Sequence, residues 1–206
     1  MRKTLVALVT AGLAALLASV AVAASPQTVT ISASRPSVVF GKSVTLSGKV
    51  SNSKASENVS VLAEPIGTTA FAALATVQTV SGGHWSEVVK PTIETSYQAK
   101  WKSATSSTVS VKVRPLITLT LVSQATGRFS TKVSAARSFA GKFVLVQRLT
   151  STGVSTLKRV TLDANSAASF SVRLHHGRSR LRVVMPTSQT APGYITGTSN
   201  VVSVSH

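Results

Sequence analysis

The chain has 206 residues, with 22 lysines and arginines against five aspartates and glutamates, and it has no cysteine. The length allows one large domain or two of about 90 residues, and the absence of cysteine excludes disulfide bonds and a lipoprotein-type anchor. A formal net charge of +17 attracts polyanions at long range and is screened by salt. The alternative is that the charge only keeps the protein soluble.

The first 24 residues have the pattern of a secretory signal peptide. Arg2 and Lys3 precede an apolar run over residues 5–22, which ends in small residues at Ala23 and Ala24. This order of a positive start, an apolar middle and a small-residue cleavage site is typical of exported proteins. We expect cleavage after Ala23 or Ala24 and a secreted or cell-surface bacterial protein without a transmembrane helix. The alternative is an uncleaved membrane anchor.

Seven short stretches between residues 25 and 114 alternate polar with apolar residues and are separated by turn residues. Such stretches, at regular spacing, predict the strands of an all-β sandwich. They comprise residues 28–34, 43–50, 58–63, 74–80, 85–89, 97–101 and 108–113.

The stretch from residue 81 to 101 predicts a strand, a corner and a second strand. Gly82 and Gly83 supply a turn, because glycine reaches positive φ without steric cost. Pro91 cannot donate to a sheet ladder and ends the first strand. Tyr97 and Trp101 share one face of the next strand, since side chains alternate with period two. We expect that face to be buried.

This stretch resembles the E strand, corner and F strand of bacterial immunoglobulin-like or fibronectin-III-like modules. The resemblance rests on Gly-Gly-x-Trp at residues 82–85, Val-x-Lys-Pro at residues 88–91 and Thr-x-Tyr-x-Ala at residues 95–99. It implies that Tyr97 ties the corner to the sheet. It also implies a structural, adhesive or ligand-presenting role without catalysis.

The same order of strands returns after residue 115, with an offset of 83 residues from Leu46 to Phe129 and 85 residues from Trp85 to Phe170. A repeat of this length predicts two tandem domains, over residues 25–114 and 115–206, after a signal peptide over residues 1–24. The short linker over residues 113–116 predicts a fairly fixed relative orientation. The predicted core residues are Trp85, Tyr97, Trp101, Phe129, Phe170 and Leu181.

Candidate catalytic groups are few. Asp163 with His175 or His176 could form part of a serine hydrolase triad, but no nucleophile motif accompanies them. Glu87 and Glu94 flank one corner and could form a glycosidase pair, although both are better explained as exposed charges near lysines. The adjacent histidines point to opposite faces of a strand and are poor joint metal ligands. We expect no enzyme activity, no metal site and no cofactor.

The strongest candidate for a binding site is a run of basic residues near the C-terminus. The charge is +5 over residues 25–114 and +10 over residues 115–206. Three alternating arginines in this run place their guanidinium groups on one face of a strand, where they suit phosphate and carboxylate groups. The alternative is an ordinary solvated strand face. The predicted polyanion-binding residues are Arg173, His175, His176, Arg178, Arg180 and Arg182.

The sequence thus predicts an exported, non-catalytic structural or adhesive protein built from two immunoglobulin-like β-sandwich domains. The expected partner is an anionic cell-wall or envelope polymer, or another surface protein. Nucleic acid is not favoured, because no aromatic residues interleave with the arginines. The alternatives are a carbohydrate- or substrate-binding accessory module, which exposure of Tyr97 and Trp101 would favour, and a secreted hydrolase.

Overall fold

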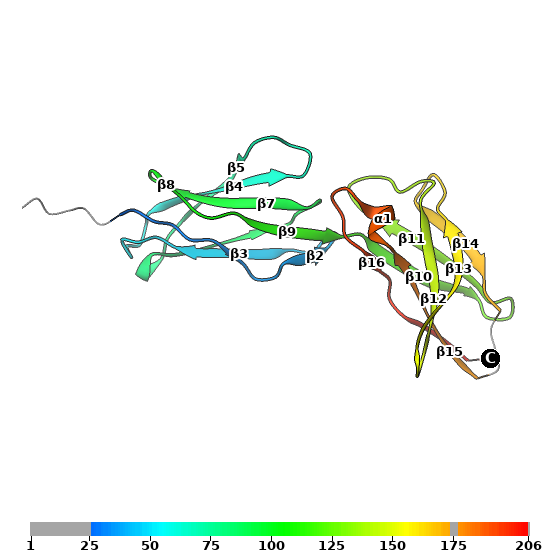
Figure 1. Cartoon of the computed structure of the whole chain (residues 1–206). Helices are drawn as coiled ribbons and strands as arrows, with labels where there is room; N and C mark the ends of the chain where they lie inside the picture. Colours follow the sequence, from blue (N-terminus) through cyan, green and yellow to red (C-terminus); the bar gives the residue numbers. More distant parts are fainter. Residues whose placement is uncertain (1–25, 174–176, 206) are drawn as a thin grey trace, which may run out of the picture.

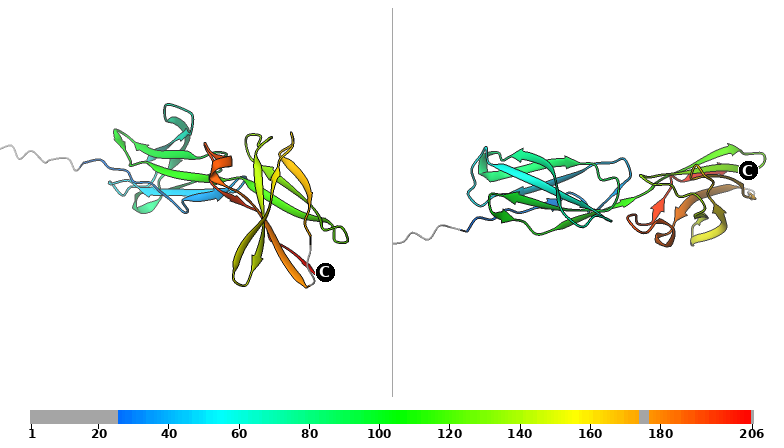
Figure 2. Two further views of the ribbon diagram at one scale, coloured as in Figure 1. Left: turned by 45° about the vertical axis from the view of Figure 1, so that its right-hand side comes forward. Right: turned by 90° about the horizontal axis from the view of Figure 1, so that it is seen from above.

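The structure is a computed structural model that describes residues 26–173 and 177–205. These residues form two tandem β-sandwich modules, which lie end to end (Figure 1 and Figure 2). We call strands β1–β9 the first module and strands β10–β17 the second module. The predicted signal peptide lies outside the described residues, as do two of the predicted binding residues, His175 and His176. In the part that is described, no helix has the length and apolar character needed to cross a membrane.

The first module packs a sheet of order β1-β3-β6 against a sheet of order β2-β9-β7-β4-β5, with β8 paired to β7. The alternating residues of these strands bury one face of each sheet. The strands are β1 (Ser32–Ala33), β2 (Ser37–Val39), β3 (Val44–Lys49), β4 (Asn58–Pro65), β5 (Ala72–Gln78), β6 (His84–Val89), β7 (Thr95–Trp101), β8 (Ala104–Thr105) and β9 (Val109–Arg114).

Within the described residues, the second module repeats this topology except that it has no counterpart of the parallel strand β2. A sheet of order β10-β11-β14 faces a sheet of order β13-β12-β15, and β15 pairs with both β16 and β17. The strands are β10 (Leu116–Ser123), β11 (Arg128–Ser134), β12 (Phe143–Thr150), β13 (Gly153–Thr161), β14 (Ala167–Ser171), β15 (Arg178–Met185), β16 (Gly197–Thr198) and β17 (Val202–Ser205).

The strand pair β3 and β6 of the first module corresponds to the pair β11 and β14 of the second. The registers of these two pairs differ by two residues. In the second module, Phe129 of β11 lies opposite Phe170 of β14, and the two rings stack with centroids 6.0 Å apart. In the first module, Trp85 of β6 lies opposite Gly48 of β3 rather than opposite Leu46. Because Gly48 has no side chain, it leaves space for the indole ring of Trp85, which is larger than the phenyl ring of Phe170.

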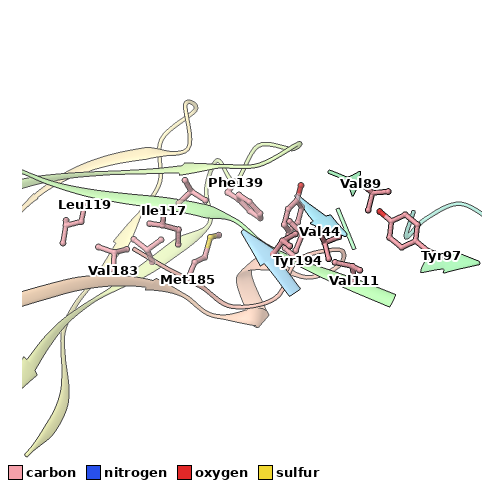
Figure 3. Packing of buried hydrophobic residues seen from close by; sticks show 14 of the residues in the cluster. Val44, Val89, Tyr97, Val111, Ile117, Leu119, Phe139, Val183, Met185 and Tyr194 are labelled. Carbon is pink, nitrogen blue, oxygen red and sulfur yellow. The ribbon is translucent and has the colours of Figure 1, made fainter. Parts of the chain in front are cut away.

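One cluster of buried apolar side chains runs through both modules. Figure 3 shows it passing from Leu119 and Met185 in the second module, past Phe139 and Tyr194, to Val44 in the first module. Burial of apolar surface contributes about 25 cal/mol per Å². The two modules are therefore joined by a continuous core as well as by the chain.

Besides the short strands β8 and β16, which were not predicted, two elements depart from the sequence prediction. The predicted strand over residues 28–34 shortens to β1, and a further strand, β2, follows Pro36 and pairs in parallel with β9. A short helix, α1 (Thr187–Thr190), stands in the long loop of the second module, where no helical periodicity predicts one. Both elements are held by contacts with distant strands, which local patterns do not reveal.

Candidate functional site

The outer face of the large sheet in the second module carries a row of arginines from β15. Arg178 and Arg180 are exposed and Arg182 is half-buried. Along β15 these arginines alternate with Ser179 and Leu181, which are buried. Because side chains of a strand alternate between faces, the three guanidinium groups point away from the core.

Neighbouring strands add a fourth arginine and apolar side chains to this face. Arg159 of β13 lies opposite Leu145 of β12, and its guanidinium group stacks over the ring of Phe143 at 4.0 Å. Arg182 donates a hydrogen bond from Nε to Oε1 of Gln147 at 3.0 Å. We call the surface formed by Arg159, Arg178, Arg180 and Arg182 the arginine face.

No carboxylate neutralises the arginine face within the described residues. The second module has a single acidic residue, Asp163, whose Oδ1 accepts hydrogen bonds from the backbone N–H groups of Asn165 and Ala167. This bonding commits Asp163 to the turn before β14. In the part that the structure covers, the only salt bridge joins Lys102 to Glu57, in the first module. The positive potential of the arginine face is therefore open to an anionic partner.

Arg173 lies apart from Arg178, Arg180 and Arg182. It follows β14, which belongs to the opposite sheet, and its carbonyl oxygen accepts a hydrogen bond from Nη2 of Arg148 at 3.1 Å. The structure thus brings together Arg178, Arg180 and Arg182, and it adds Arg159, which the sequence pattern did not single out. No sequence pattern marks Arg159. Its place on this face follows from the pairing of β13 with β12, which only the structure shows.

The six residues expected in the core are all buried, with at most 6% of their surface exposed. Tyr97 and Trp101 therefore offer no aromatic surface on which a sugar ring could stack. The exposure that would favour the carbohydrate-binding alternative is not observed for these two side chains.

The link between Tyr97 and the corner, which the resemblance implies, is indirect: Tyr97 neighbours Thr95, whose Oγ1 donates to the carbonyl oxygen of Ile93 at 2.8 Å. Within the described residues, the Tyr97 hydroxyl makes no hydrogen bond to the backbone of the corner between β6 and β7. The tyrosine hydroxyl that reaches this corner belongs to Tyr194 of the second module, which donates to the carbonyl oxygen of Thr92 at 2.6 Å. A residue 102 positions away thus supplies the contact.

Tyr194 is the centre of the junction between the modules. Its hydroxyl also accepts a hydrogen bond from the backbone N–H of Ala136 at 2.9 Å. Its ring packs edge-on against Phe139 at 5.7 Å, and the guanidinium group of Arg137 lies 5.6 Å from it. Burial raises the pKa of Tyr194, whereas the Ala136 amide and the Arg137 charge lower it. The phenol therefore stays neutral and can donate its proton to Thr92.

Backbone hydrogen bonds complete the junction. The N–H of Glu94 donates to the carbonyl oxygen of Gly193 at 2.9 Å, and the N–H of Ile195 donates to that of Val113 at 3.0 Å. Arg114, the last residue of β9, donates from Nη1 to the carbonyl oxygen of Thr196 at 2.8 Å. The loop after α1 thus continues the hydrogen bonding of the first module.

The candidate catalytic residues do not assemble in the described part of the chain. Glu94 shares a shallow hollow of about 290 Å³ with Glu64, whereas Glu87 lines a different one. Asp163 is held in its turn, and the histidines proposed to join it lie outside the described residues. Within residues 26–173 and 177–205, no group of three or more histidine, aspartate or glutamate side chains is placed to hold a metal ion.

Glu57 holds the far end of the first module together. Its carboxylate accepts hydrogen bonds from Nε1 of Trp101 at 2.9 Å and from Nδ2 of Asn52 at 2.7 Å, and it lies 3.5 Å from Nζ of Lys102. The bond from Trp101, and then that from Asn52, lower the pKa of Glu57 below its ordinary value of 4.5. The carboxylate therefore stabilises the fold in its charged form.

This lowered pKa predicts an acid-sensitive contribution to stability. Because the folded pKa lies below the unfolded one, the contribution is complete above pH 4.5 and is lost as the pH falls through the folded value. Urea unfolding of Glu57→Gln across this range will show a weaker loss of stability on acidification than the unchanged protein. Glu87→Gln, which removes a carboxylate without such partners in the described residues, is the control. Equal acid sensitivity of Glu57→Gln and the unchanged protein would contradict the assignment.

Fold and surface together define the class: an all-β protein of two tandem sandwich modules, with a basic sheet face and a buried junction. No family model matches the sequence, and no curated protein matches it. Among solved structures, the chain is similar to a tetra-tandem repeat in the extending region of a large adhesion protein. The identity is 14% and the TM-score 0.37, over 87% of this chain and 49% of the other. The chain thus spans about half the length of that structure, and a likeness of this size carries no argument about function.

Proposed function

We propose that this chain is an exported, non-catalytic adhesive or structural protein that contacts an anionic polymer of the cell envelope. The observation that carries the proposal is the arginine face, where four guanidinium groups share one side of a sheet. Arginine binds phosphate and carboxylate groups through paired N–H donors.

The junction supports the structural part of the proposal. Tandem modules set a defined distance and direction only if neighbouring modules keep a fixed orientation. Tyr194, the bonded loop after α1 and the shared core give the two modules such a fixed relation. We infer that the two modules act as one rigid unit that presents the arginine face. In this proposal the two domains comprise residues 25–114 and 115–206, and residues 1–24 direct export.

A binding experiment tests the polymer contact. Protein comprising residues 25–206 is titrated with purified cell envelope over a series of salt concentrations. Replacing Arg178, Arg180 and Arg182 with serine will weaken binding on the order of 100-fold, since a basic side chain near an anionic surface contributes about 1 kcal/mol. Binding of the unchanged protein will also fall as salt rises.

A second variant, which loses the same number of positive charges from the first module, is the control. Lys42, Lys54 and Lys112 are exposed residues of the first module, and their replacement with serine removes the same three charges elsewhere. This variant will bind nearly as well as the unchanged protein. Equal weakening of both variants would mean that net charge alone acts, and binding that ignores both salt and substitution would overturn the proposal.

A further inference from the structure

A small hollow lies on the other side of the sheet from the arginine face. Its volume is about 260 Å³, and it opens where the hairpin of β12 and β13 meets the end of β14. It is lined by Arg148, Leu157, Lys158, Ser171, Val172 and Arg173. Three of these six residues are cationic and none is acidic.

Arg148 projects into the space between the two sheets. Its register partner on β15 is Leu181, which is fully buried, whereas its neighbour Gln147 is bonded to the arginine face. The bond from Nη2 to the Arg173 carbonyl oxygen fixes one end of the guanidinium group. Nε is buried and has no hydrogen-bond partner among the described residues.

An N–H donor that is buried without a partner destabilises the fold, and it does so more strongly when it is charged. Arg137 offers a comparison, because its Nε is also unpaired. The guanidinium group of Arg137, however, lies over the rings of Phe139 and Tyr194, which partly compensate its charge. No such ring contact is found for Arg148 in the described part of the chain. Its Nε is closed to solvent, so an acceptor in the hollow would reach the Nε–H only after a small movement of the side chain.

The other lining residues favour an anion as that acceptor. Lys158 and Arg173 are both exposed and can turn toward the hollow, and Ser171 adds a hydroxyl group. Leu157 and Val172 form an apolar wall, which strengthens electrostatic attraction by excluding water. The single acidic side chain of the second module, that of Asp163, is already bonded within its turn.

We propose that this hollow binds one tetrahedral oxyanion, a phosphate or sulfate group. A phosphate group offers three or more acceptor oxygens that diverge in space, and guanidinium and ammonium donors are its usual partners. A carboxylate has two oxygens in one plane and would leave donors from three cationic side chains incompletely used. The site is separate from the arginine face, so it does not depend on the polymer contact proposed above.

Nuclear magnetic resonance of arginine Nε–H groups tests the site directly. Protein comprising residues 25–206 is titrated with inorganic phosphate, sodium chloride being adjusted to keep the ionic strength constant. The Nε–H signal of Arg148 will shift in a saturable way with a dissociation constant on the order of 1 mM, equivalent to about −4 kcal/mol. Sulfate will act similarly, and acetate will bind at least about 10-fold more weakly.

Two variants that each lose one positive charge test whether phosphate binds in the hollow or on the arginine face. Arg148→Gln will weaken phosphate binding by about 10-fold or more, and Arg180→Gln, on the arginine face, will leave it unchanged. Lys158→Gln changes an exposed residue and will weaken binding even if Arg148→Gln proves unstable. The proposal is overturned if the Arg148 signal does not saturate, if acetate binds as tightly as phosphate, or if Arg180→Gln and Lys158→Gln have equal effects.

Discussion

Replacing Tyr194 with alanine will both destabilise the second module and release it from the first. The side chain is 2% exposed, packs against Phe139 and donates to Thr92 across the junction. Loss of a buried aromatic side chain costs about 3–5 kcal/mol. Urea unfolding will report this loss of free energy, and small-angle X-ray scattering will report a broader range of inter-module distances.

Two further substitutions serve as controls. One separates the packing of the Tyr194 ring from its hydrogen bonds, and the other tests whether the location of the tyrosine at the junction matters. Tyr194→Phe keeps the ring but removes both hydrogen bonds of the hydroxyl, at a cost of about 1–3 kcal/mol. Tyr97→Ala removes an equally buried tyrosine from within the first module. It will destabilise that module without broadening the inter-module distances. An unchanged scattering profile for Tyr194→Ala would show that Tyr194 does not hold the junction.

Replacing Gly48 with alanine will destabilise the first module even though the added group is a single methyl. An alanine Cβ at this position would lie 1.8 Å from the carbonyl oxygen of Thr30 and 2.7 Å from Nε1 of Trp85. The nearest atom is backbone, so the N-terminal segment would have to move away from β3. Overpacking of this kind costs about 1–3 kcal/mol and at times more, and it will appear as a lower midpoint of thermal unfolding.

Gly67 provides the matched control for this substitution. A Cβ on Gly67 meets nothing within 4 Å, but its φ of +94° is a conformation that glycine adopts most easily. Gly67→Ala therefore costs only the backbone strain, about 1–2 kcal/mol, without displacing a strand. A Gly48→Ala protein as stable as the unchanged one would contradict the close approach of Thr30 to β3.

Much of the fold follows from short-range patterns in the sequence. Tyr97, Ala99 and Trp101 share a buried face because alternate residues of any strand do, and the same rule places Arg178 and Arg180 outside. The recurrence of one strand order indicates two tandem modules, and the observed sheets repeat that order. The binding role of the arginines stays a prediction, as do the domain boundaries.

Other features of the fold depend on contacts between segments that are far apart in the sequence. Tyr97 matches the tyrosine of the resembling modules, yet the corner is bonded by Tyr194 from a loop with no recognisable pattern. Strand β2 forms because β9 lies beside it, and Arg159 joins the arginine face through the register of β12 and β13.

The sequence by itself determined most of the strands, their inward and outward faces and the excess of positive charge. Alternation and composition act over a few residues, so they can be recognised without knowing the fold. The tertiary structure alone decided the junction around Tyr194, the close approach at Gly48 and the hollow beside Arg148. Each of these sites joins groups from distant parts of the chain, and their meeting depends on how the sheets pack and twist, which no local spacing specifies.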